Sequence, residues 1–464
     1  MARSLLPDED PDSPPPWLLP GQVPSFRRVL AAIRRHHGAV LADPVGSGKT
    51  YVALAAAAAL NPDGPTACLV PATLCGQWQA VAAGRGLTVV VVSHQQLSRG
   101  HLPEGTRGLV IVDESHHFRN PGTRRYRHIA PWLVGRATLM VTATPIVNRL
   151  DDLAHQLLLG VRDDALLGDG VASLRSLLAG GCGSPALGRL VIENPGIAVT
   201  RPERTAWTSR PDRRECTAAT EALEIITPLR LSGRRSVASL VRAVLCRAAS
   251  SSPAALVVAL ERYRLLLLQS RDANRAGRRL ERAEIRRFTG DLEEQLVWWE
   301  LLPAEQEEME PELDLTDLEA IEAVLRHARR LAEAPDPKLD RLQALLADQR
   351  PTLVFVARRE TVRYLRDRIG GSTIAWCTGE RAGLGRSSVP RATVLEWFGD
   401  GAGAEIAERI GVRHLVVTDV AAEGLDLQRA ARVIHYDLPW TPMRLEQREG
   451  RAVRLGSRHR SVEV

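Results

Sequence analysis

The stretch DPVGSGKT at residues 43–50 decides the fold, because it lies between an apolar run, AVLA at 39–42, and a helical run, VALAAAAAL at 52–60. A strand, a short glycine-containing loop and a helix in this order are typical of a phosphate-binding loop. Gly46 and Gly48 let backbone N–H groups approach phosphate oxygens, and the start of the helix adds its positive dipole end. The segment therefore predicts a nucleotide site.

Two side chains at the end of this loop have expected roles. Lys49 is expected to neutralise the β- and γ-phosphates of ATP, and Thr50 to hold Mg²⁺. Lys49 and Lys338 are the only lysines in the chain, and the other basic residues are arginines. Lys49 thus indicates a position that requires an ammonium group. Asp43 replaces the first glycine of the usual pattern, and Ser47 completes the expected ATP-binding loop.

Outward from the loop, apolar runs alternate with helical stretches. The runs are GAVLAD (38–43), TACLVP (66–71), LTVVVVS (87–93), GLVIVDE (108–114) and ATLMVTATP (137–145). This alternation predicts an α/β domain with a parallel sheet flanked by helices, over residues 19–165. Several runs end in polar residues, and an open α/β sheet binds its ligand at that edge.

One of these strand ends, VIVDESHH, carries two adjacent carboxylates. We assign Asp113 to Mg²⁺ and Glu114 to the attacking water, because phosphoryl transfer needs both a metal ligand and a group that orients the nucleophile. His116 and His117 suggest zinc, but adjacent histidines point in different directions and lack a partner set. We instead expect His116 to couple the nucleotide site to nucleic acid.

Composition divides the rest of the chain. Residues 1–18 are acidic and Pro-rich and are predicted to be a disordered leader. Residues 166–345 are rich in Arg, Glu, Leu and Ala and predict a helical insertion, whose charges are solvated faces or, alternatively, contacts to DNA. The α/β pattern returns over 346–464. The final HRSVEV resembles the opening of a strand, which raises the alternative of a second lobe without its last elements.

Other properties limit the class of protein. The chain has 464 residues, a net charge of +6 and 44% hydrophobic residues, without a secretory signal or a long apolar run. We expect a cytoplasmic protein with no membrane contact. The six cysteines are scattered and predict neither a zinc site nor a disulfide framework. The modest basic charge permits a polyanionic partner.

The order of these motifs resembles the Swi/Snf branch of superfamily 2 helicases, more narrowly the bacterial forms related to the RNA-polymerase-associated ATPase. The resemblance implies two RecA-like domains with a helical insertion. It implies that Gln22 reads adenine. It implies that LVPATLCGQW (69–78) and VSHQQL (92–97) contact the nucleic-acid backbone, and that VTATPIVN (141–148) couples hydrolysis to movement. The residues concerned are Thr73, Gln77 and Ser93 for nucleic acid, and Thr142 and Thr144 for coupling.

Two further segments carry the resemblance in the second lobe. In VTDVAAEGLDLQ (417–428) it implies that Gly424 and Asp426 face the nucleotide and that Thr418 lies near nucleic acid. In EQREGRAVRLG (446–456) it implies an arginine-finger motif that includes Gln447 as a coupling residue and Arg448. Arg451 and Arg454 lie three residues apart, so on one helix both could reach phosphate oxygens of ATP bound by the other lobe.

These features predict an ATP- and Mg²⁺-dependent motor that moves on double-stranded DNA. One alternative is a nucleotide-gated subunit that acts on a protein partner, such as RNA polymerase or a phage-defence complex. A second is an RNA- or DNA-unwinding helicase. A chain that binds ATP without hydrolysing it is disfavoured, because Lys49, Glu114, Arg451 and Arg454 are all present.

Overall fold

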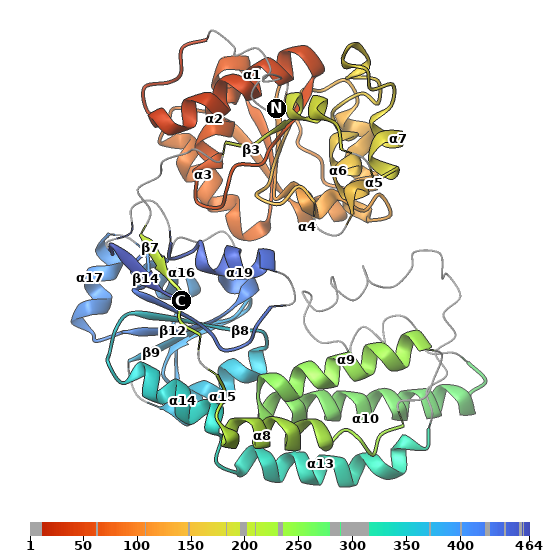
Figure 1. Cartoon of the computed structure of the whole chain (residues 1–464), viewed down its shortest axis with the longest axis vertical. Helices are drawn as coiled ribbons and strands as arrows, with labels where there is room; N and C mark the ends of the chain where they lie inside the picture. The colour runs from red at the N-terminus through yellow and green to blue at the C-terminus, as the bar shows by residue number, and fades with distance from the viewer. Residues whose placement is uncertain are drawn as a thin grey trace. The chain divides into compact units, whose positions relative to one another are not determined.

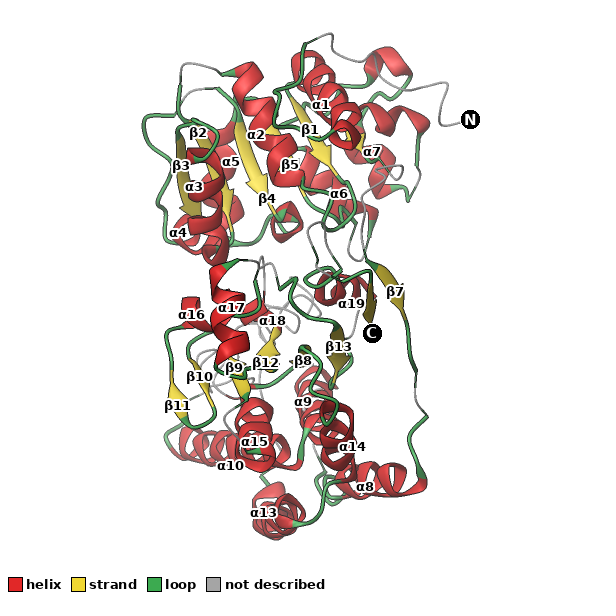
Figure 2. Cartoon of the chain, turned by 90° about the vertical axis from the view of Figure 1, so that its left-hand side faces the viewer, coloured by secondary structure: helices red, strands yellow, loops and turns green. Residues whose placement is uncertain are grey.

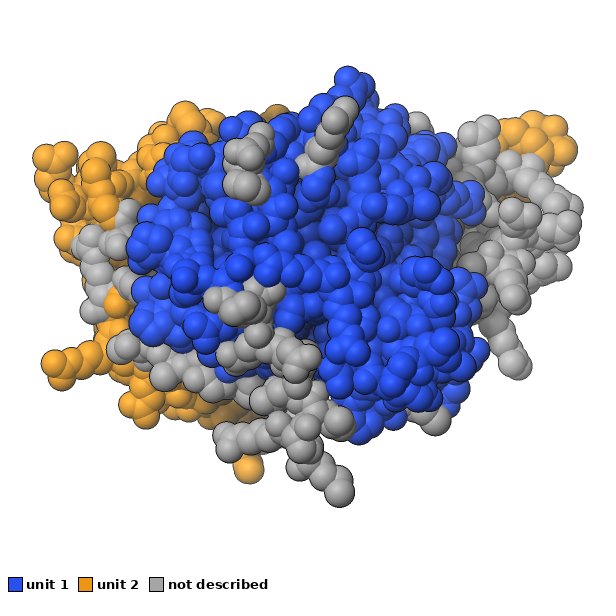
Figure 3. All heavy atoms as spheres, turned by 90° about the horizontal axis from the view of Figure 1, so that it is seen from above, with its two compact units in different colours: residues 1–201 blue, residues 202–464 orange. Residues whose placement is uncertain are grey.

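The computed structural model divides the chain into two compact units, Met1–Arg201 and Pro202–Val464 (Figure 3). It describes residues 12–61, 64–106, 108–146, 149–181, 183–194, 202–208, 210–230, 235–278, 288, 315–370, 373–399, 401–422, 427–439, 442–453, 457 and 459–464. Each unit contains a largely parallel sheet with helices on its faces (Figure 2). The predicted α/β class is confirmed.

The sheet of the first unit has six parallel strands in the order β3-β2-β4-β5-β1-β6. They are β1 (Gly38–Leu41), β2 (Thr66–Val70), β3 (Val89–Ser93), β4 (Val110–Asp113), β5 (Thr138–Val141) and β6 (Val191–Ile192). Asp113 pairs in register with Val141, and Val141 with Leu41. The carboxyl ends of β4, β5 and β1 are therefore level, and the segments that follow them start from one edge.

Helices cover both faces of this sheet because alternate strand residues point to opposite sides. Leu41 and its equivalents pack under α1 (Val23–His36), α2 (Lys49–Leu60) and α3 (Cys75–Ala83). Val40 and its equivalents pack under α4 (His94–Ser98), α5 (Arg124–Leu133), α6 (Leu150–Leu157) and α7 (Leu174–Ala179). Helix α2 is buried from Val52 to Ala57, and its small side chains let it lie close to the sheet.

The limits of the first unit differ from the predicted ones. Trp17 and Leu18, expected in a disordered leader, pack against the core, and Leu18 is only 7% exposed. The free energy gained by burying these two apolar side chains outweighs the tendency of the surrounding polar, Pro-rich sequence to be disordered. At the other end, β6 pairs with β1 well beyond residue 165, so the boundary inferred from the change in composition falls inside the unit.

The second sheet has the order β11-β10-β9-β12-β8-β13-β14-β7. Its strands are β7 (Glu203–Thr205), β8 (Thr352–Val356), β9 (Ile374–Cys377), β10 (Ala382–Leu384), β11 (Ser387–Ser388), β12 (His414–Thr418), β13 (Arg432–His435) and β14 (Ser461–Glu463). Antiparallel pairing is confined to β9, β10 and β11 among these pairs. The HRSVEV segment forms β14, which pairs with both β13 and β7.

Helices flank this sheet as well. One face packs against α14 (Pro337–Leu346) and α15 (Arg359–Ile369), and the other against α16 (Arg391–Glu396) and α17 (Ala402–Arg409). Two further helices, α18 (Asp419–Ala422) and α19 (Pro442–Glu449), follow β12 and β13. They carry parts of the two segments that resemble helicase motifs in the second lobe.

Between β7 and β8 the chain forms the helical segment, which contains α8 (Arg213–Glu224), α9 (Arg235–Ser251), α10 (Pro253–Arg275) and α13 (Asp317–Glu333) (Figure 1). These helices share their own apolar core. Because β7 belongs to the second sheet, the segment is inserted within the second unit. Helix α10 ends at Arg275, and Gly277 takes a left-handed φ of 64° shortly after it.

Two expectations from composition can be compared with the described ranges. Five cysteines there are free, namely Cys68, Cys75, Cys216, Cys246 and Cys377, while Cys182 lies outside them. No group of three potential ligands for a metal ion occurs among the His, Cys, Asp and Glu residues that the structure describes. None of the described helices is both long and apolar enough to cross a bilayer.

Gly160 provides a test of the packing beside β5. A Cβ at this position would lie 2.4 Å from Cβ and 2.7 Å from Oγ1 of Thr138, a buried β-branched residue. We expect Gly160→Ala to destabilise the protein by about 1–3 kcal/mol, because an overpacked core must shift to admit the methyl group. Urea unfolding followed by tryptophan fluorescence measures the effect.

Gly168→Ala is the matched control, since its Cβ would meet no atom within 4 Å and its φ is not positive. Equal urea midpoints for the two variants would contradict the tight packing of residue 160 against Thr138.

Candidate active site

The phosphate loop follows β1 and ends where α2 begins at Lys49. Gly46 and Gly48 have φ values of 75° and 79°, in the left-handed region that favours glycine. Gly48 is the N-cap residue of α2. The loop thus has glycines at the positions where its backbone is left-handed, as the sequence predicted. Helix α2 begins directly after it.

The Lys49 ammonium group lies over its own loop. Its Nζ donates to the carbonyl oxygens of Asp43 and Pro44, at 2.8 and 3.1 Å. Thr50 occupies the second position of α2, next to Lys49. The cation is therefore held at the loop by weakly basic carbonyl groups, which an anionic phosphate could replace as the stronger partner.

Asp43 has a supporting position. Its side chain is fully buried, and Oδ1 accepts a hydrogen bond of 2.8 Å from the backbone N of Asn194, beyond β6. Burial raises the pKa of this carboxyl group. The carboxylate thus connects the phosphate loop to the edge of the sheet, while the backbone carbonyl of Asp43 accepts from Lys49.

Gln22 contacts the same loop from η2 (Pro20–Gln22). Its Nε2 donates to the carbonyl oxygens of Ser47 at 2.8 Å and Gly48 at 3.4 Å, and its Oε1 accepts from the backbone N of Leu19 at 3.1 Å. The side chain is only 2% exposed. The sequence-predicted glutamine and phosphate loop therefore lie together, joined through the amide group.

Asp113, at the end of β4, is the most strongly constrained carboxylate of the site. Oδ2 accepts a buried hydrogen bond of 2.9 Å from Trp78 Nε1, and Oδ1 accepts one of 3.0 Å from the backbone N of Glu114. Burial, and then the neighbouring Glu114 charge, raise the pKa of Asp113 to about 7. A cation nearby would offset both effects.

Glu114 follows with a left-handed φ of 48°, a conformation that is strained for a residue with a side chain. Its carboxylate is 21% exposed, whereas Asp113 is buried. The turn thus separates two adjacent carboxylates into a buried one and a partly accessible one. This separation fits a division between metal binding and water activation.

The donor set also fits a magnesium ion. Asp113 and Thr50 offer carboxylate and hydroxyl oxygens, the ligand type that Mg²⁺ prefers together with water and phosphate oxygens. The raised pKa of Asp113 means that burial and the Glu114 charge disfavour its ionised form, which a nearby cation would stabilise. When bound, Mg²⁺ would neutralise charge on the phosphates.

His116 connects the ends of β4 and β5. Its Nδ1 lies 3.1 Å from Thr142 Oγ1 and 3.3 Å from Glu114 Oε2. Thr142 Oγ1 in turn accepts from the backbone N of Thr144 at 3.1 Å. Three of the four predicted coupling residues, His116, Thr142 and Thr144, therefore form one continuous set of contacts that begins at Glu114.

Two contributing residues were not predicted in these roles. Trp78 is 1% exposed, and its Nε1 donates to Asp113 Oδ2. Gln156 is fully buried. It accepts from Ser115 Oγ at 2.8 Å and donates to the carbonyl oxygen of Pro145 at 2.7 Å. A polar residue on the apolar face of α6 is the only signal that could have identified it.

The residues predicted to contact nucleic acid differ in accessibility. Thr73, in η3 (Ala72–Leu74), and Gln77, on α3, are half-buried. Ser93 is 5% exposed and caps α4 by accepting from Gln96 N at 3.1 Å, which leaves its hydroxyl little surface to offer. Thr418, at the end of β12, is likewise 5% exposed.

In the second unit, the arginine-finger segment departs from one expectation. Helix α19 ends at Glu449, and Arg451 lies in the following turn, where its carbonyl oxygen accepts from Leu427 N at 3.0 Å. Gly450, which has a low helix propensity, interrupts the helix. Arg451 is thus not on a helix face. Gln447 is half-buried on α19, while Arg454, Gly424 and Asp426 lie outside the described residues.

Sequence comparison finds a family match in the second unit. Residues 337–456 match the family model described as the helicase conserved C-terminal domain. Together with the phosphate loop and the Asp113–Glu114 pair, this match supports the resemblance to superfamily 2 helicases and ATPases that the motifs indicated.

Individual relatives agree with that class. The chain is similar to an uncharacterised ATP-dependent helicase, YqhH, of Bacillus subtilis (strain 168), at 53% identity over 45 residues, or 10% of this chain and 8% of that protein. It is also similar to the RNA polymerase-associated protein RapA of Cronobacter sakazakii (strain ATCC BAA-894), at 30% identity over 130 residues, or 27% of this chain and 12% of that protein. The matches span only a small part of either relative.

Among solved structures, the helicase domain of Hef from Pyrococcus furiosus aligns with 95% of this chain and 94% of its own, with a TM-score of 0.44 and 14% sequence identity.

The buried Asp113 makes stability depend on pH. Its ordinary pKa is 3.8, so between about pH 4 and 7 the unfolded chain has lost this proton while the folded chain keeps it. The contribution of Asp113 to the free energy of unfolding therefore falls as the pH rises through that range, and it is constant above about pH 7. Asp113→Asn removes the titration, so we expect its stability relative to wild type to rise from pH 4 to 7 and then level off.

Urea unfolding at a series of pH values, in buffer without divalent metal or nucleotide, measures this difference. Asparagine also mismatches one of the two donors at this position, which shifts the whole curve without changing its shape. Parallel pH curves for the two proteins would contradict the raised pKa.

Proposed function

We propose that the chain is an ATP-dependent motor that moves on double-stranded DNA. The proposal rests chiefly on one observation, the continuous set of contacts from Glu114 through His116 and Thr142 to Thr144 at the end of the sheet that carries the phosphate loop. A group that senses the γ-phosphate can influence the β5 loop through these contacts. A simple nucleotide-binding module does not need such a connection.

The proposed chemistry assigns one task to each side chain. Lys49 exchanges the Asp43 and Pro44 carbonyl groups for phosphate oxygens. Glu114 orients and polarises the attacking water, since its carboxylate is partly exposed whereas that of Asp113 is buried. Asp113 and Thr50 hold Mg²⁺. The barrier falls mainly through positioning and charge neutralisation, as in other phosphoryl transfers.

The resemblance further assigns Arg451 and Arg454 to charge that develops on the phosphoryl group in the transition state. Loss of the γ-phosphate would remove the partner of these guanidinium groups and end their engagement. Repeated engagement and release would be a ligand-driven shift between two shapes. Contacts to the DNA backbone would make binding tolerant of sequence and sensitive to salt.

The second candidate function is a nucleotide-gated subunit that acts on a protein partner. It is favoured by the relative whose name includes association with RNA polymerase, although that similarity covers a small part of both chains. An RNA- or DNA-unwinding helicase is the other alternative within the motor class. The preferred activating polymer distinguishes all three.

We expect steady-state ATP hydrolysis by wild type to be stimulated strongly by duplex DNA and less by single-stranded DNA or RNA. Glu114→Gln should lower the stimulated rate about 10²- to 10⁴-fold, because it removes the group that activates water. Phosphate release measured with each polymer, and with none, gives the comparison.

Glu104→Gln changes an exposed carboxylate in the same unit and serves as the charge-matched control. Hydrolysis that responds to RNA alone would favour the RNA alternative. Hydrolysis indifferent to all three polymers would contradict the motor and favour the protein-directed subunit.

A further inference from the structure

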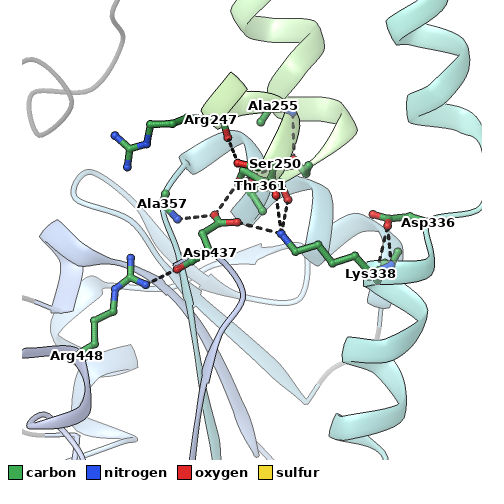
Figure 4. Close-up of polar contacts among 12 residues, drawn as sticks. Arg247, Ser250, Ala255, Asp336, Lys338, Ala357, Thr361, Asp437 and Arg448 are labelled. Carbon is green, nitrogen blue, oxygen red and sulfur yellow. Dashed lines mark hydrogen bonds and ion pairs between the residues drawn. The ribbon is translucent and has the colours of Figure 1, made fainter. Parts of the chain in front are cut away.

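The second lysine of the chain, Lys338, lies at a junction in the second unit. Its Nζ donates to the carbonyl oxygens of Ser250 and Ser251 at 2.8 and 3.1 Å, and to Asp437 Oδ1 at 3.2 Å (Figure 4). The same nitrogen lies 3.8 Å from the ring centroid of Tyr436. Lys338 is the second residue of α14, the two serines end α9, and Asp437 follows β13.

This site is suited to an ammonium group. Three N–H donors meet three acceptors, and two of these are carbonyl groups at the end of α9, where the helix dipole is negative. An arginine side chain is longer than that of lysine, and its planar guanidinium directs the N–H donors within one plane. It therefore does not fit acceptors that surround a point above the ring of Tyr436. The retention of lysine in a chain that otherwise uses arginine has the same explanation here as at Lys49.

Asp437 is the centre of the junction. Its Oδ2 accepts from Ser251 Oγ at 2.7 Å and from Ala357 N at 2.8 Å, and its side chain is only 7% exposed (Figure 4). Thr361, at the start of α15, lies 2.7 Å from Ser251 Oγ. One carboxylate thus holds the end of α9, the lysine of α14 and the backbone after β8.

The backbone of Asp437 continues the connection to α19. Arg448 donates to the Asp437 carbonyl oxygen through one guanidinium nitrogen, at 2.5 Å, and to both carboxylate oxygens of Asp419 through the others, at 2.5 and 2.7 Å. Arg448 is 3% exposed. Asp419 starts α18 in the 417–428 segment, and Arg448 lies in the 446–456 segment.

We propose that Lys338 is a positioning residue that connects the helical segment to α19. By holding Asp437 against the end of α9, it fixes the carbonyl group that orients Arg448, and with it the turn that carries Arg451. Docking of the helical segment would then set how well the two motif segments are aligned. The positioning of α19 by Lys338 does not depend on the proposed function, whereas its consequence for ATP turnover rests on that function.

The junction is separable from the other contacts that dock the helical segment. Arg262 on α10 forms an ion pair of 2.5 Å with Glu360 on α15, and Arg358 donates to the Val244 carbonyl oxygen at 3.2 Å. Neither of these two bonds involves Asp437. Glu360→Gln therefore weakens docking of the same helical segment, through α10 and α15, without removing a bond to Asp437, and it serves as the matched control.

Hydrogen exchange tests the structural part in the full-length protein without nucleotide. The reporters are the amides of Gly450, Ala452 and Val453, which donate to the last carbonyl groups of α19. Glu449 is also held by Arg204, at 2.5 and 3.0 Å, so we expect a limited effect. Lys338→Met should speed their exchange about threefold to tenfold through local opening. Glu360→Gln should leave it unchanged.

Lys338→Arg tests whether charge alone suffices, and it should resemble Lys338→Met. Ser251→Ala removes the contact to Asp437 from the α9 side and replaces Lys338→Met if that variant does not fold. Unchanged exchange in the variants that fold, or wild-type exchange in Lys338→Arg, would overturn the proposal.

Kinetics test the consequence for turnover. Lys338→Met should lower the DNA-stimulated kcat about tenfold while leaving the KM for ATP within about twofold, because the phosphate loop belongs to the first unit. Altered exchange with unaltered kcat would refute the link to turnover. A wild type that no polymer stimulates would refute the proposed function, and the exchange result would still decide the structural part.

Discussion

The buried carboxylate of Asp113 is the constraint on which the first unit's site depends. A negative charge without solvent needs donors or a cation, and the protein supplies one indole N–H and one backbone N–H. The indole brings Trp78 of α3 to β4, and the backbone bond fixes the turn that gives Glu114 its left-handed conformation. The conformation of Glu114 is therefore determined by the hydrogen bonds that allow Asp113 to be buried.

The consequences extend along the sheet. Because β4, β5 and β1 end level, the turn after Asp113 lies beside the loop after β5, where His116 meets Thr142. Gln156 makes a second connection between these turns through Ser115 and Pro145. Two independent connections thus join segments that follow different strands, and this favours concerted over separate movement.

The sequence predicted the strands well, because five apolar runs and a glycine-containing loop have few alternative folds. It also predicted where Lys49 and Asp113 lie, in the loop after β1 and at the end of β4, because each position follows from the apolar run just before it. It did not predict the boundary after residue 165, because β6 is only two residues long. Nor did it predict the Asp437 junction, whose members come from four distant segments. The end of α19 at Glu449 was missed because a helical pattern continued through Gly450.

The short strand β7 makes the connection between the units more than a passive linker. It forms the edge of the second sheet, pairs with β14, and through Arg204 makes a bidentate ion pair with Glu449 at the end of α19. The chain leaving the first unit is thus attached to the second within a few residues. Tension applied along that chain would load a shear contact between two parallel strands, which resists force better than a contact that opens one bond at a time.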